Sequence, residues 1–157
     1  MIKIKIPAGQ ELTLEHLVLD YNGTLAVDGH LKPHVREKLN FLAQDLTIHI
    51  ITADTFGICA AECEGIPCTL QLLDNSCPGG PQKENFIQTL GPSKVVAVGN
   101  GANDRQMLAS AALGIAVLGD EGTCAKCLID ADVMVRNILD ALDLLIHPKR
   151  LVATLRQ

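Results

Sequence analysis

Apolar runs of strand length alternate along this chain with segments whose apolar residues recur at helical spacing. A short continuous apolar run is typical of a buried strand, whereas a repeat every three or four residues predicts a helix. Strands are predicted at residues 16–20, 46–51, 69–73, 94–98, 114–118 and 132–135. Helices are predicted at residues 33–44, 53–64, 83–90, 104–111, 123–129 and 137–146. This alternation predicts an α/β fold with a doubly wound parallel sheet and helices on both faces.

Two further segments show the pattern of hairpins. Residues 2–6 alternate Ile and Lys before the turn Pro7-Ala8-Gly9, which predicts a strand or hairpin over residues 2–14. Within residues 25–31, the dipeptide Asp28-Gly29 lies between apolar residues, a signal of a short hairpin. The N-terminus lacks the continuous apolar stretch of a secretory signal, so a cytoplasmic location is the default expectation.

Length and composition agree with a packed α/β core. The chain has 157 residues, of which 48% are hydrophobic and only 3% aromatic, with no Trp. A chain of this length suits one domain, so residues 1–157 are expected to form a single domain. No repeat or linker divides the sequence, and the segments between its motifs are too short for a large cap domain.

Charge and hydropathy exclude two classes of partner. The formal net charge is −5, which argues against nucleic acid, because nucleic-acid binding needs a basic face. The only basic cluster, at residues 147–150 with Arg156, is interpreted as a solvated helix end. The longest apolar runs are strand-sized, far below the roughly 20 residues of a membrane helix, so ion transport by this chain alone is excluded.

The segment Leu19-Asp20-Tyr21-Asn22-Gly23-Thr24-Leu25 carries the main chemical signal. Asp20 ends an apolar run, and Gly23 lets the backbone turn sharply behind it. In an open parallel sheet, ligands bind at the carboxyl ends of the strands. Asp20 is therefore a candidate nucleophile, although on this peptide alone it could equally begin an Asx turn.

Three further motifs follow in a fixed order. Thr52 ends an apolar strand, Lys83 stands at the start of a helix, and residues 99–104 read Gly-Asn-Gly-Ala-Asn-Asp after another strand. With Asp20 to Thr24, these segments make the chain resemble the haloacid dehalogenase (HAD) superfamily, whose first motif is Asp-x-Asp-Gly-Thr. The fourth motif is most similar to the phosphorylation domain of P-type ATPases and to the small group of soluble P-type ATPase-like proteins.

The resemblance implies a fold, a cofactor and roles for particular residues. The fold would be a Rossmann-like HAD core without a large cap, and the cofactor Mg²⁺. Asp20 would form an aspartyl phosphate, and Lys83 would offset negative charge between nucleophile and phosphate. The implied catalytic residues are Asp20, Asn22, Thr52 and Lys83. The implied phosphate-binding residues are Gly23, Thr24, Thr52, Ala53 and Lys83. The implied metal-binding residues are Asp20, Asn22 through its backbone carbonyl, Asn100 and Asp104, the last directly or through water.

Two positions depart from the superfamily pattern. Asn22 replaces the carboxylate that protonates the leaving group and later activates water, work that needs a titratable side chain. Asn100 replaces an Asp, which removes one negative charge near the metal and should lower metal affinity. Slow turnover is therefore expected. Both Asn residues precede Gly, so deamidation to Asp in aged preparations is a further hypothesis, which intact mass on fresh protein would test.

Six cysteines allow a thiol-based alternative. In a cytosolic chain, reduced thiols are expected before disulfides. Cys124 and Cys127 have CxxC spacing and could join Cys59 and Cys63 around zinc, although no second CxxC pair accompanies the first. The alternative is that these are small, semi-buried residues in two helices.

The sequence thus predicts a Mg²⁺-dependent phosphohydrolase or phosphotransferase that acts on a small phosphorylated molecule. ATP is a weak candidate, because the nucleotide-binding domain that P-type ATPases insert is missing. The competing interpretation is a binding or regulatory protein with weak or no catalysis, and the third is a thiol-based metal-handling protein. A homo-oligomer could wall the open site through the apolar stretch 138–155, unless that stretch covers its own sheet.

Overall fold

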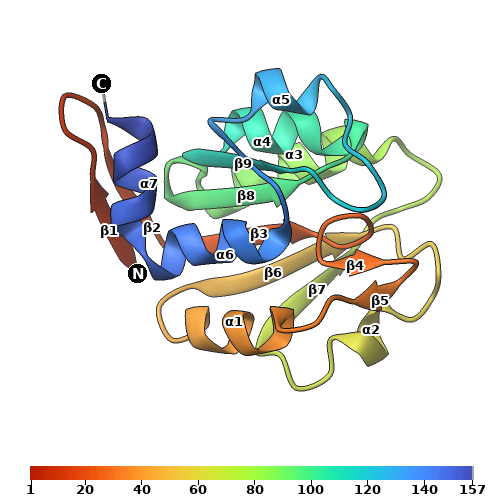
Figure 1. Ribbon diagram of the computed structural model, residues 1–157. Coiled ribbons are helices and arrows are strands. Elements are labelled where there is room, and N and C mark those ends of the chain that lie inside the picture. Colours follow the sequence, from red (N-terminus) through yellow and green to blue (C-terminus); the bar gives the residue numbers. More distant parts are fainter. Residues whose placement is uncertain (157) are drawn as a thin grey trace.

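The computed structural model describes residues 1–156, and a six-stranded parallel sheet forms its centre (Figure 1). The strand order is β10-β9-β8-β3-β6-β7, so the chain starts in the middle and winds outward in both directions. The strands of this sheet are β3 (His16–Asp20), β6 (Thr47–Thr52), β7 (Cys68–Leu72), β8 (Val95–Gly99), β9 (Leu113–Val117) and β10 (Val133–Val135). The predicted doubly wound parallel sheet is therefore confirmed.

Helices cover both faces of the sheet, as the alternation predicted. One face packs against α1 (Val35–Leu42) and α6 (Ile138–Ile146), and the other packs against α3 (Gly79–Leu90), α4 (Arg105–Ser110) and α5 (Cys127–Asp130) (Figure 1). Alternate residues of each strand enter these two cores, because successive side chains of a strand point to opposite faces. Leu17 and Leu19 of β3 enter the first core, and Val18 enters the second.

An antiparallel hairpin lies beside the sheet at the end where the chain begins. It is formed by β1 (Ile2–Lys5) and β2 (Glu11–Leu14), as expected from the Ile–Lys alternation. The last helix, α7 (Pro148–Leu155), lies next to it (Figure 1). Leu151 of α7 is fully buried in the same core as α6. The apolar stretch 138–155 therefore covers the protein's own sheet.

Three helices differ from their predicted bounds because of local backbone chemistry. Helix α2 occupies only Cys59–Glu62, since Asp54 at φ 47° and Gly57 at φ 69° turn the preceding chain out of helical geometry. Helix α5 begins at Cys127, because the backbone N–H of Cys124 donates instead to a distant carbonyl. Helix α3 begins earlier, at Gly79, and includes Pro81 in its first turn. Pro is tolerated there because the N–H groups of a first turn have no intrahelical acceptor, so the N–H that Pro lacks costs no hydrogen bond.

In the part of the chain that the structure describes, no large insertion stands over the carboxyl ends of the strands. The insertion after β3 is the small hairpin of β4 (Ala26–Val27) and β5 (His30–Leu31), which lies where the Asp28-Gly29 signal predicted it. The architecture corresponds to a HAD core without a large cap. Within residues 1–156, no helix has the length and apolar character to cross a membrane.

Candidate active site

The sheet order brings three of the predicted site residues to one place. Asp20 ends β3, which lies between β6 and β8. Thr52 is the last residue of β6, and Asn100 directly follows β8. Because carboxyl ends of neighbouring parallel strands share one edge, these side chains meet there. All three are buried, with between 2% and 8% of their surface exposed.

A buried lysine joins the two acidic residues of the site. Nζ of Lys83 lies 2.5 Å from Oδ1 of Asp20 and 2.6 Å from Oδ1 of Asp104. Lys83 is 1% exposed and Asp104 is fully buried. A buried charge is costly unless it is paired, so this triad is an arrangement that the fold retains at an energetic cost. Two carboxylates and one ammonium leave one net negative charge for a bound cation to balance.

The charges in this triad shift one another's pKa. Burial and the neighbouring charge of Asp104 raise the pKa of Asp20 to about 7, against the opposing effects of Lys83 and Thr24. Burial on its own would lower the pKa of Lys83, but the charges of Asp20 and Asp104 raise it to about 12. Lys83 is therefore a cation at neutral pH, whereas Asp20 needs a further positive charge to be fully ionised.

The turn after Asp20 is held by its own backbone and by a close approach to the fourth motif. The carbonyl of Tyr21 accepts from the N–H groups of Thr24, Leu25 and Ala26. Gly23 has φ 79°, and a Cβ at this position would lie 2.5 Å from Nδ2 of Asn100. Glycine is thus required both by the left-handed backbone and by the lack of space.

Asn22, at the position of the missing acid/base carboxylate, has an unsatisfied acceptor. Its Oδ1 is buried and has no hydrogen-bond partner among residues 1–156. Buried polar atoms are paired in most proteins, so an unpaired one at a candidate site points to a ligand or water there. An amide can donate and accept hydrogen bonds at this point, but it cannot release a proton.

The side chain of Asp104 holds the backbone of the fourth motif, to which Asp104 itself belongs. Oδ2 of Asp104 accepts from the backbone N–H groups of Asn100 and Gly101, at 2.9 and 2.8 Å, while Oδ1 accepts from Lys83. A Cβ on Gly99 would lie 2.5 Å from this carboxyl group, so glycine is needed for the close approach. Both oxygens of Asp104 are thus occupied by protein donors, which favours an indirect contribution to a metal site.

The oxygens nearest to Asp20 are of the kind that Mg²⁺ binds. Oγ1 of Thr24 lies 3.2 Å from Oδ2 of Asp20 and 3.0 Å from Oδ1 of Asn100, so the two acceptors flank the same hydroxyl. Carboxylate and amide oxygens are suitable ligands for a hard cation. The donor types therefore fit Mg²⁺, with Asp20 as the single direct carboxylate. Within the described residues, no group of three or more His, Cys, Asp or Glu is placed to hold a metal by itself.

Thr52 occupies the position expected for the second motif. Its Oγ1 accepts from the backbone N–H of Asp54 at 2.9 Å, which orients the hydroxyl at the end of β6. Oδ1 of Asp54 in turn accepts from the N–H of Cys59 at 3.1 Å and so fixes the start of α2. Ala53 is half-buried beside Thr52. The structure thus places all the predicted site residues in segments at the same edge of the sheet.

Sequence reasoning missed one supporting segment, residues 119–127. A Cβ on Gly119 would lie 2.4 Å from the carbonyl oxygen of Gly23, so this segment packs directly on the turn after Asp20. Nδ2 of Asn100 donates to the carbonyl of Gly122, and the thiol of Cys127 donates to that of Gly101, both at 2.8 Å. Nothing in the sequence pairs this segment with the motifs.

The β4–β5 hairpin is fixed on both of its sides. Towards residues 119–127, Lys32 pairs with Asp120 at 2.5 Å and the N–H of Asp28 donates to Glu121 at 2.8 Å. Towards α2, the N–H of Leu31 donates to Glu62 at 2.8 Å. The hydroxyl of Tyr21 donates to the carbonyl of Gly29 beneath it. These bonds make the hairpin a fixed wall of the site.

The zinc site proposed from the cysteines is wrong. Cys59 and Cys63 pack in the core on the α1 and α6 face of the sheet. Cys124 and Cys127 pack on the opposite face. The sheet separates the two pairs, so a cluster of these four thiols cannot form. Cys59, Cys63 and Cys127 are buried core residues, and Cys124 is half-buried.

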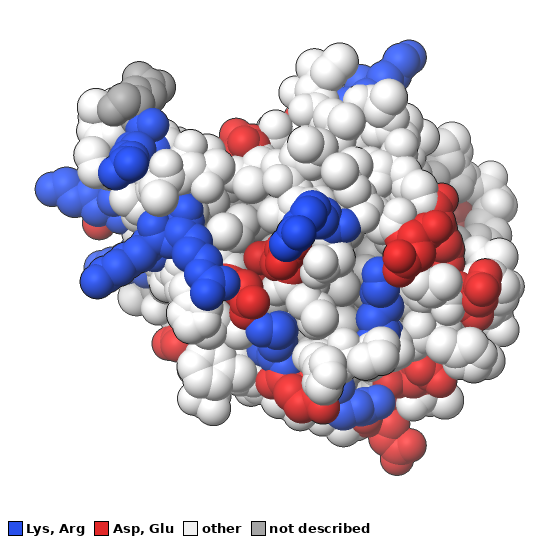
Figure 2. All heavy atoms as spheres, in the orientation of Figure 1, with Lys and Arg blue, Asp and Glu red and all other residues white. Residues whose placement is uncertain are grey.

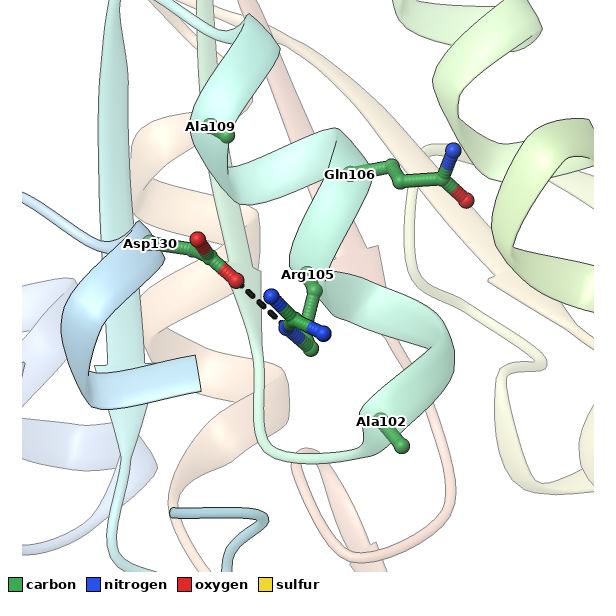
Figure 3. Close-up of a pocket in the computed structure, with 5 residues that line it drawn as sticks. All are labelled: Ala102, Arg105, Gln106, Ala109 and Asp130. Atoms are coloured by element: carbon green, nitrogen blue, oxygen red, sulfur yellow. Dashed lines mark hydrogen bonds and ion pairs between the residues drawn. The ribbon is translucent and has the colours of Figure 1, made fainter. Parts of the chain in front are cut away.

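One hollow on the surface lies outside this site. Its volume is about 350 Å³, and its lining residues are Ala102, Arg105, Gln106, Ala109 and Asp130. In Figure 3, Arg105 and Asp130 point toward one another across it, with Nε and Oδ2 2.5 Å apart, and Gln106 points away toward α3. The ion pair joins α4 to α5. Because α4 directly follows the fourth motif, this link also supports the motif.

Basic side chains do not cluster on the surface around the candidate site in the view of Figure 2. In Figure 2, Lys and Arg side chains cluster over α7 and the β1–β2 hairpin, whereas acidic side chains gather near the β4–β5 hairpin. Within the site itself, the buried Lys83 supplies a positive charge.

Two kinds of comparison relate the chain to known proteins. No family model matches it. The uncharacterized protein MJ0073 of Methanocaldococcus jannaschii is 51% identical over 63 residues, which is 40% of this chain and 68% of that protein. The uncharacterized protein MJ0072 of the same organism is 46% identical over 39 residues, 25% of this chain and 89% of that protein. The chain belongs to the family of these archaeal proteins.

Solved structures show the wider relationship. The cobalt-bound deoxy-D-mannose-octulosonate 8-phosphate phosphatase of Haemophilus influenzae matches with a TM-score of 0.71 and 10% identity, over 92% of this chain and 94% of the other. The corresponding phosphatase of Moraxella catarrhalis, in complex with magnesium ion, phosphate ion and KDO, matches with a TM-score of 0.68 and 16% identity over 91% and 94%. A HAD-superfamily phosphatase of Bacteroides thetaiotaomicron matches with a TM-score of 0.63 and 12% identity over 91% and 96%. The chain has the capless HAD fold.

Proposed function

We propose that this protein is a Mg²⁺-dependent phosphohydrolase or phosphotransferase that acts on a small phosphorylated molecule through a phospho-Asp20 intermediate. The observation that carries the proposal is the buried bridge of Lys83 between Asp20 and Asp104, with N–O distances of 2.5 and 2.6 Å. A fold does not by itself define an activity, but a buried, paired carboxylate at the carboxyl end of β3 supports one.

The chemistry divides into two displacements at phosphorus. A carboxylate oxygen of Asp20 attacks in line, an acyl phosphate bond forms, and the bond from phosphorus to the leaving oxygen breaks. The charge on Lys83 offsets the negative charge shared between nucleophile and phosphate. Water then attacks the phosphorus of the intermediate and releases inorganic phosphate together with free Asp20, or an acceptor hydroxyl takes the phosphoryl group instead.

A cation would be held by Oδ2 of Asp20, Oδ1 of Asn100 and the backbone carbonyl of Asn22. When bound, Mg²⁺ neutralises charge on the phosphate oxygens and on Asp20. The substitution at position 100 leaves one fewer carboxylate for this task, so weaker Mg²⁺ binding than in a site with Asp at that position is part of the proposal.

The neutral side chain of Asn22 sets the rate and the choice of leaving group. Without a carboxylate there, nothing at this position gives a proton to the departing oxygen or takes one from water. Slow turnover follows, together with a preference for leaving groups of low pKa, which depart without protonation. Acyl phosphates and aryl phosphates meet this condition better than alkyl phosphates do.

The substrate class is supported by the open shape of the site. The solved neighbours include a 3-deoxy-D-manno-octulosonate 8-phosphate phosphatase in complex with magnesium ion, phosphate ion and KDO. Without a cap, selection in this chain falls to the β4–β5 hairpin and to residues 119–123, which wall the site. We therefore propose a small phosphorylated molecule, and not a large nucleotide, as the substrate.

The test is Mg²⁺-dependent phosphate release from acetyl phosphate and p-nitrophenyl phosphate by fresh protein. Asp20→Asn should reduce release by at least about 10³-fold, because the nucleophile is removed. Intact mass after brief reaction should show a phosphoryl adduct in the wild type and none in the variant. Asp45→Asn, an exposed change ahead of β6 at the opposite end of the sheet, serves as the matched control and should keep its activity.

If neither the wild type nor Asp20→Asn releases phosphate while both still bind Mg²⁺, the proposed enzymatic activity is rejected. That result would support the interpretation as a binding or regulatory protein. Release that persists in Asp20→Asn would reject Asp20 as the nucleophile. A gain of activity on storage, with a mass increase at Asn22 or Asn100, would trace the activity to deamidated protein.

A further inference from the structure

One edge of the central sheet is open and lacks the usual protection. Strand β7 is the last in the order, hydrogen-bonded to β6 alone. Proteins protect such edges with charged side chains, Pro, bulges or a covering helix, because a free edge pairs with other strands. Residues 66–73 read Ile-Pro-Cys-Thr-Leu-Gln-Leu-Leu, with no charge and with the Pro ahead of the strand. The register from Ile48↔Cys68 to Thr52↔Leu72 runs without a bulge.

Among residues 1–156, no helix covers this edge. Between β7 and α3 lies a groove of about 320 Å³, lined by side chains of both elements. Thr69 and Gln71 of β7 are exposed on this face of the sheet. On the other face, Leu72 is 55% exposed. Both faces of β7 are therefore partly accessible next to its free backbone.

The direction of the backbone groups follows from one hydrogen bond. The N–H of Leu73 donates to the carbonyl of Thr52 in β6 at 2.9 Å. Because successive residues of a strand direct their N–H and C=O groups to opposite sides, Thr69 and Gln71 face β6 and Leu70 and Leu72 face outward. The side-chain amide of Gln71 donates to the carbonyl of Leu72 at 3.2 Å. This bond partly replaces the hydrogen bonds that a neighbouring strand would make, and a paired strand would displace it.

The other edge differs in strand length and in the charges directly next to the strand. Strand β10 has only three residues, and it is flanked by Asp132 and Arg136. Short strands and adjacent charges are protective features, so β10 is better guarded than β7, which is longer and whose nearest acidic residues, Glu64 and Asp74, lie farther from the strand. Met134 in β10 is nevertheless 53% exposed, which makes it a close match to Leu72 in kind and exposure.

We propose that β7 is the interface for a second copy of this chain, paired antiparallel across a two-fold axis at Leu70. In this register, Leu70 lies opposite Leu70 of the second copy, and each Leu72 lies opposite Cys68. Apolar side chains meet on one face of the extended sheet. On the other face, Thr69 meets Gln71, which is an uncharged pair that can form hydrogen bonds.

Charge favours this register as well. The protein has a net charge of −5, so two copies repel wherever acidic groups meet. The acidic residues that flank β7 are Glu64 and Asp74. Two-fold pairing at Leu70 places Asp74 opposite Ile66 and Glu64 opposite Ser76, so no acidic residue faces another directly. A strand from a different protein would not be related to β7 by this two-fold axis, so its charges would not be kept apart from Glu64 and Asp74 in this way.

The experiment measures self-association of the full chain by sedimentation over a range of concentrations. The wild type should reach a dimer of twice 16.8 kDa. Leu72→Lys should weaken the dimer at least tenfold, since it brings a desolvated charge to the pairing edge. Gln71→Lys, on the other face of β7, should do the same. Met134→Lys, at the guarded edge, is the control and should leave the dimer intact.

Amide exchange locates the interface. In the wild-type dimer, the outward N–H groups of Leu70 and Leu72 should exchange at least tenfold more slowly than in Leu72→Lys, with core amides unchanged. A wild type that stays monomeric, a dimer that survives both β7 variants while each remains folded, or fast exchange of Leu70 within the dimer would each overturn the proposal. These readouts are independent of phosphatase activity.

Discussion

Asp20 and Lys83 are charged side chains whose burial costs the folded chain stability. Both are buried, and a second carboxylate, Asp104, competes for the same ammonium group. The raised pKa of Asp20 means that its ionised form is less stable in the folded chain than in water. Strongly shifted pKa values of this kind cluster at functional sites, in keeping with the role proposed for Asp20.

Replacement of Asp20 by Asn should therefore stabilise the metal-free protein above pH 7. The folded pKa of about 7 exceeds the ordinary value of 3.8, so the folded state binds the extra proton, and stability falls as pH rises through that window. The variant lacks this loss and should gain about 1–3 kcal/mol at pH 8. Urea unfolding in EDTA measures the gain, with Asp28→Asn as control. A variant less stable than wild type would contradict the sign.

His49 provides an opposite pH effect, away from the site. It is buried on β6, between Nδ1 of His16 at 3.1 Å and Oγ1 of Thr69 at 2.7 Å. Burial and the neighbouring His16 lower its pKa from 6.5 to about 4. The folded protein thus holds this imidazole neutral where an unfolded chain would protonate it.

Stability should consequently fall as pH drops from about 6.5 to about 4. In that window the unfolded chain binds a proton at His49 that the folded chain excludes, so about 1–3 kcal/mol is lost. His49→Gln should flatten this part of the profile of unfolding free energy against pH. His147→Gln, at an exposed position, should leave it unchanged. An identical slope in wild type and His49→Gln would exclude the effect.

At the scale of elements, the β4–β5 hairpin illustrates how a short insertion can substitute for a cap. It has only two residues in each strand, too few to be stable alone. Its bonds to Glu62 on one side and to Asp120 and Glu121 on the other hold it against the site. The hairpin is thus part of the core architecture and forms a static wall.

Removal of one of these contacts should loosen the hairpin without unfolding the chain. Glu62→Ala deletes the acceptor for the N–H of Leu31, a loss of about 0.5–1.5 kcal/mol of local stability. Exchange of the Leu31 amide should quicken about two- to tenfold while amides of β3 and β8 stay protected. Glu64→Ala, an exposed neighbour, is the matched control. Uniform quickening throughout the protein would show that α2 supports the whole fold instead.

At the scale of the molecule, the sheet determines both the site and the free edge. Winding outward from β3 places Asp20 at the switch in direction, between β6 and β8, where ligands bind in such sheets. The same winding leaves β7 as the outermost strand. The single-domain organisation of residues 1–157 stays a prediction, as does the cytoplasmic location.

The sequence by itself determined the elements and the candidate residues. Apolar periodicity located the central strands to within a few residues, because burial on both faces demands continuous apolar runs. Asp20, Thr52, Lys83 and Asp104 could be selected by their order along the chain. The bounds of α2 and α5 could not, since side-chain and distant backbone acceptors, such as Asp54 and the carbonyl of Asn100, override local helix propensity.

Only the tertiary structure decided how these residues share their contacts. Sequence order cannot tell that both oxygens of Asp104 are occupied, that Oδ1 of Asn22 is left unpaired, or that residues 119–127 brace the turn after Asp20. It also could not show that the sheet separates Cys59 and Cys63 from Cys124 and Cys127. Periodicity records which side chains are buried, whereas hydrogen-bond partners depend on long-range distances that only the folded chain establishes.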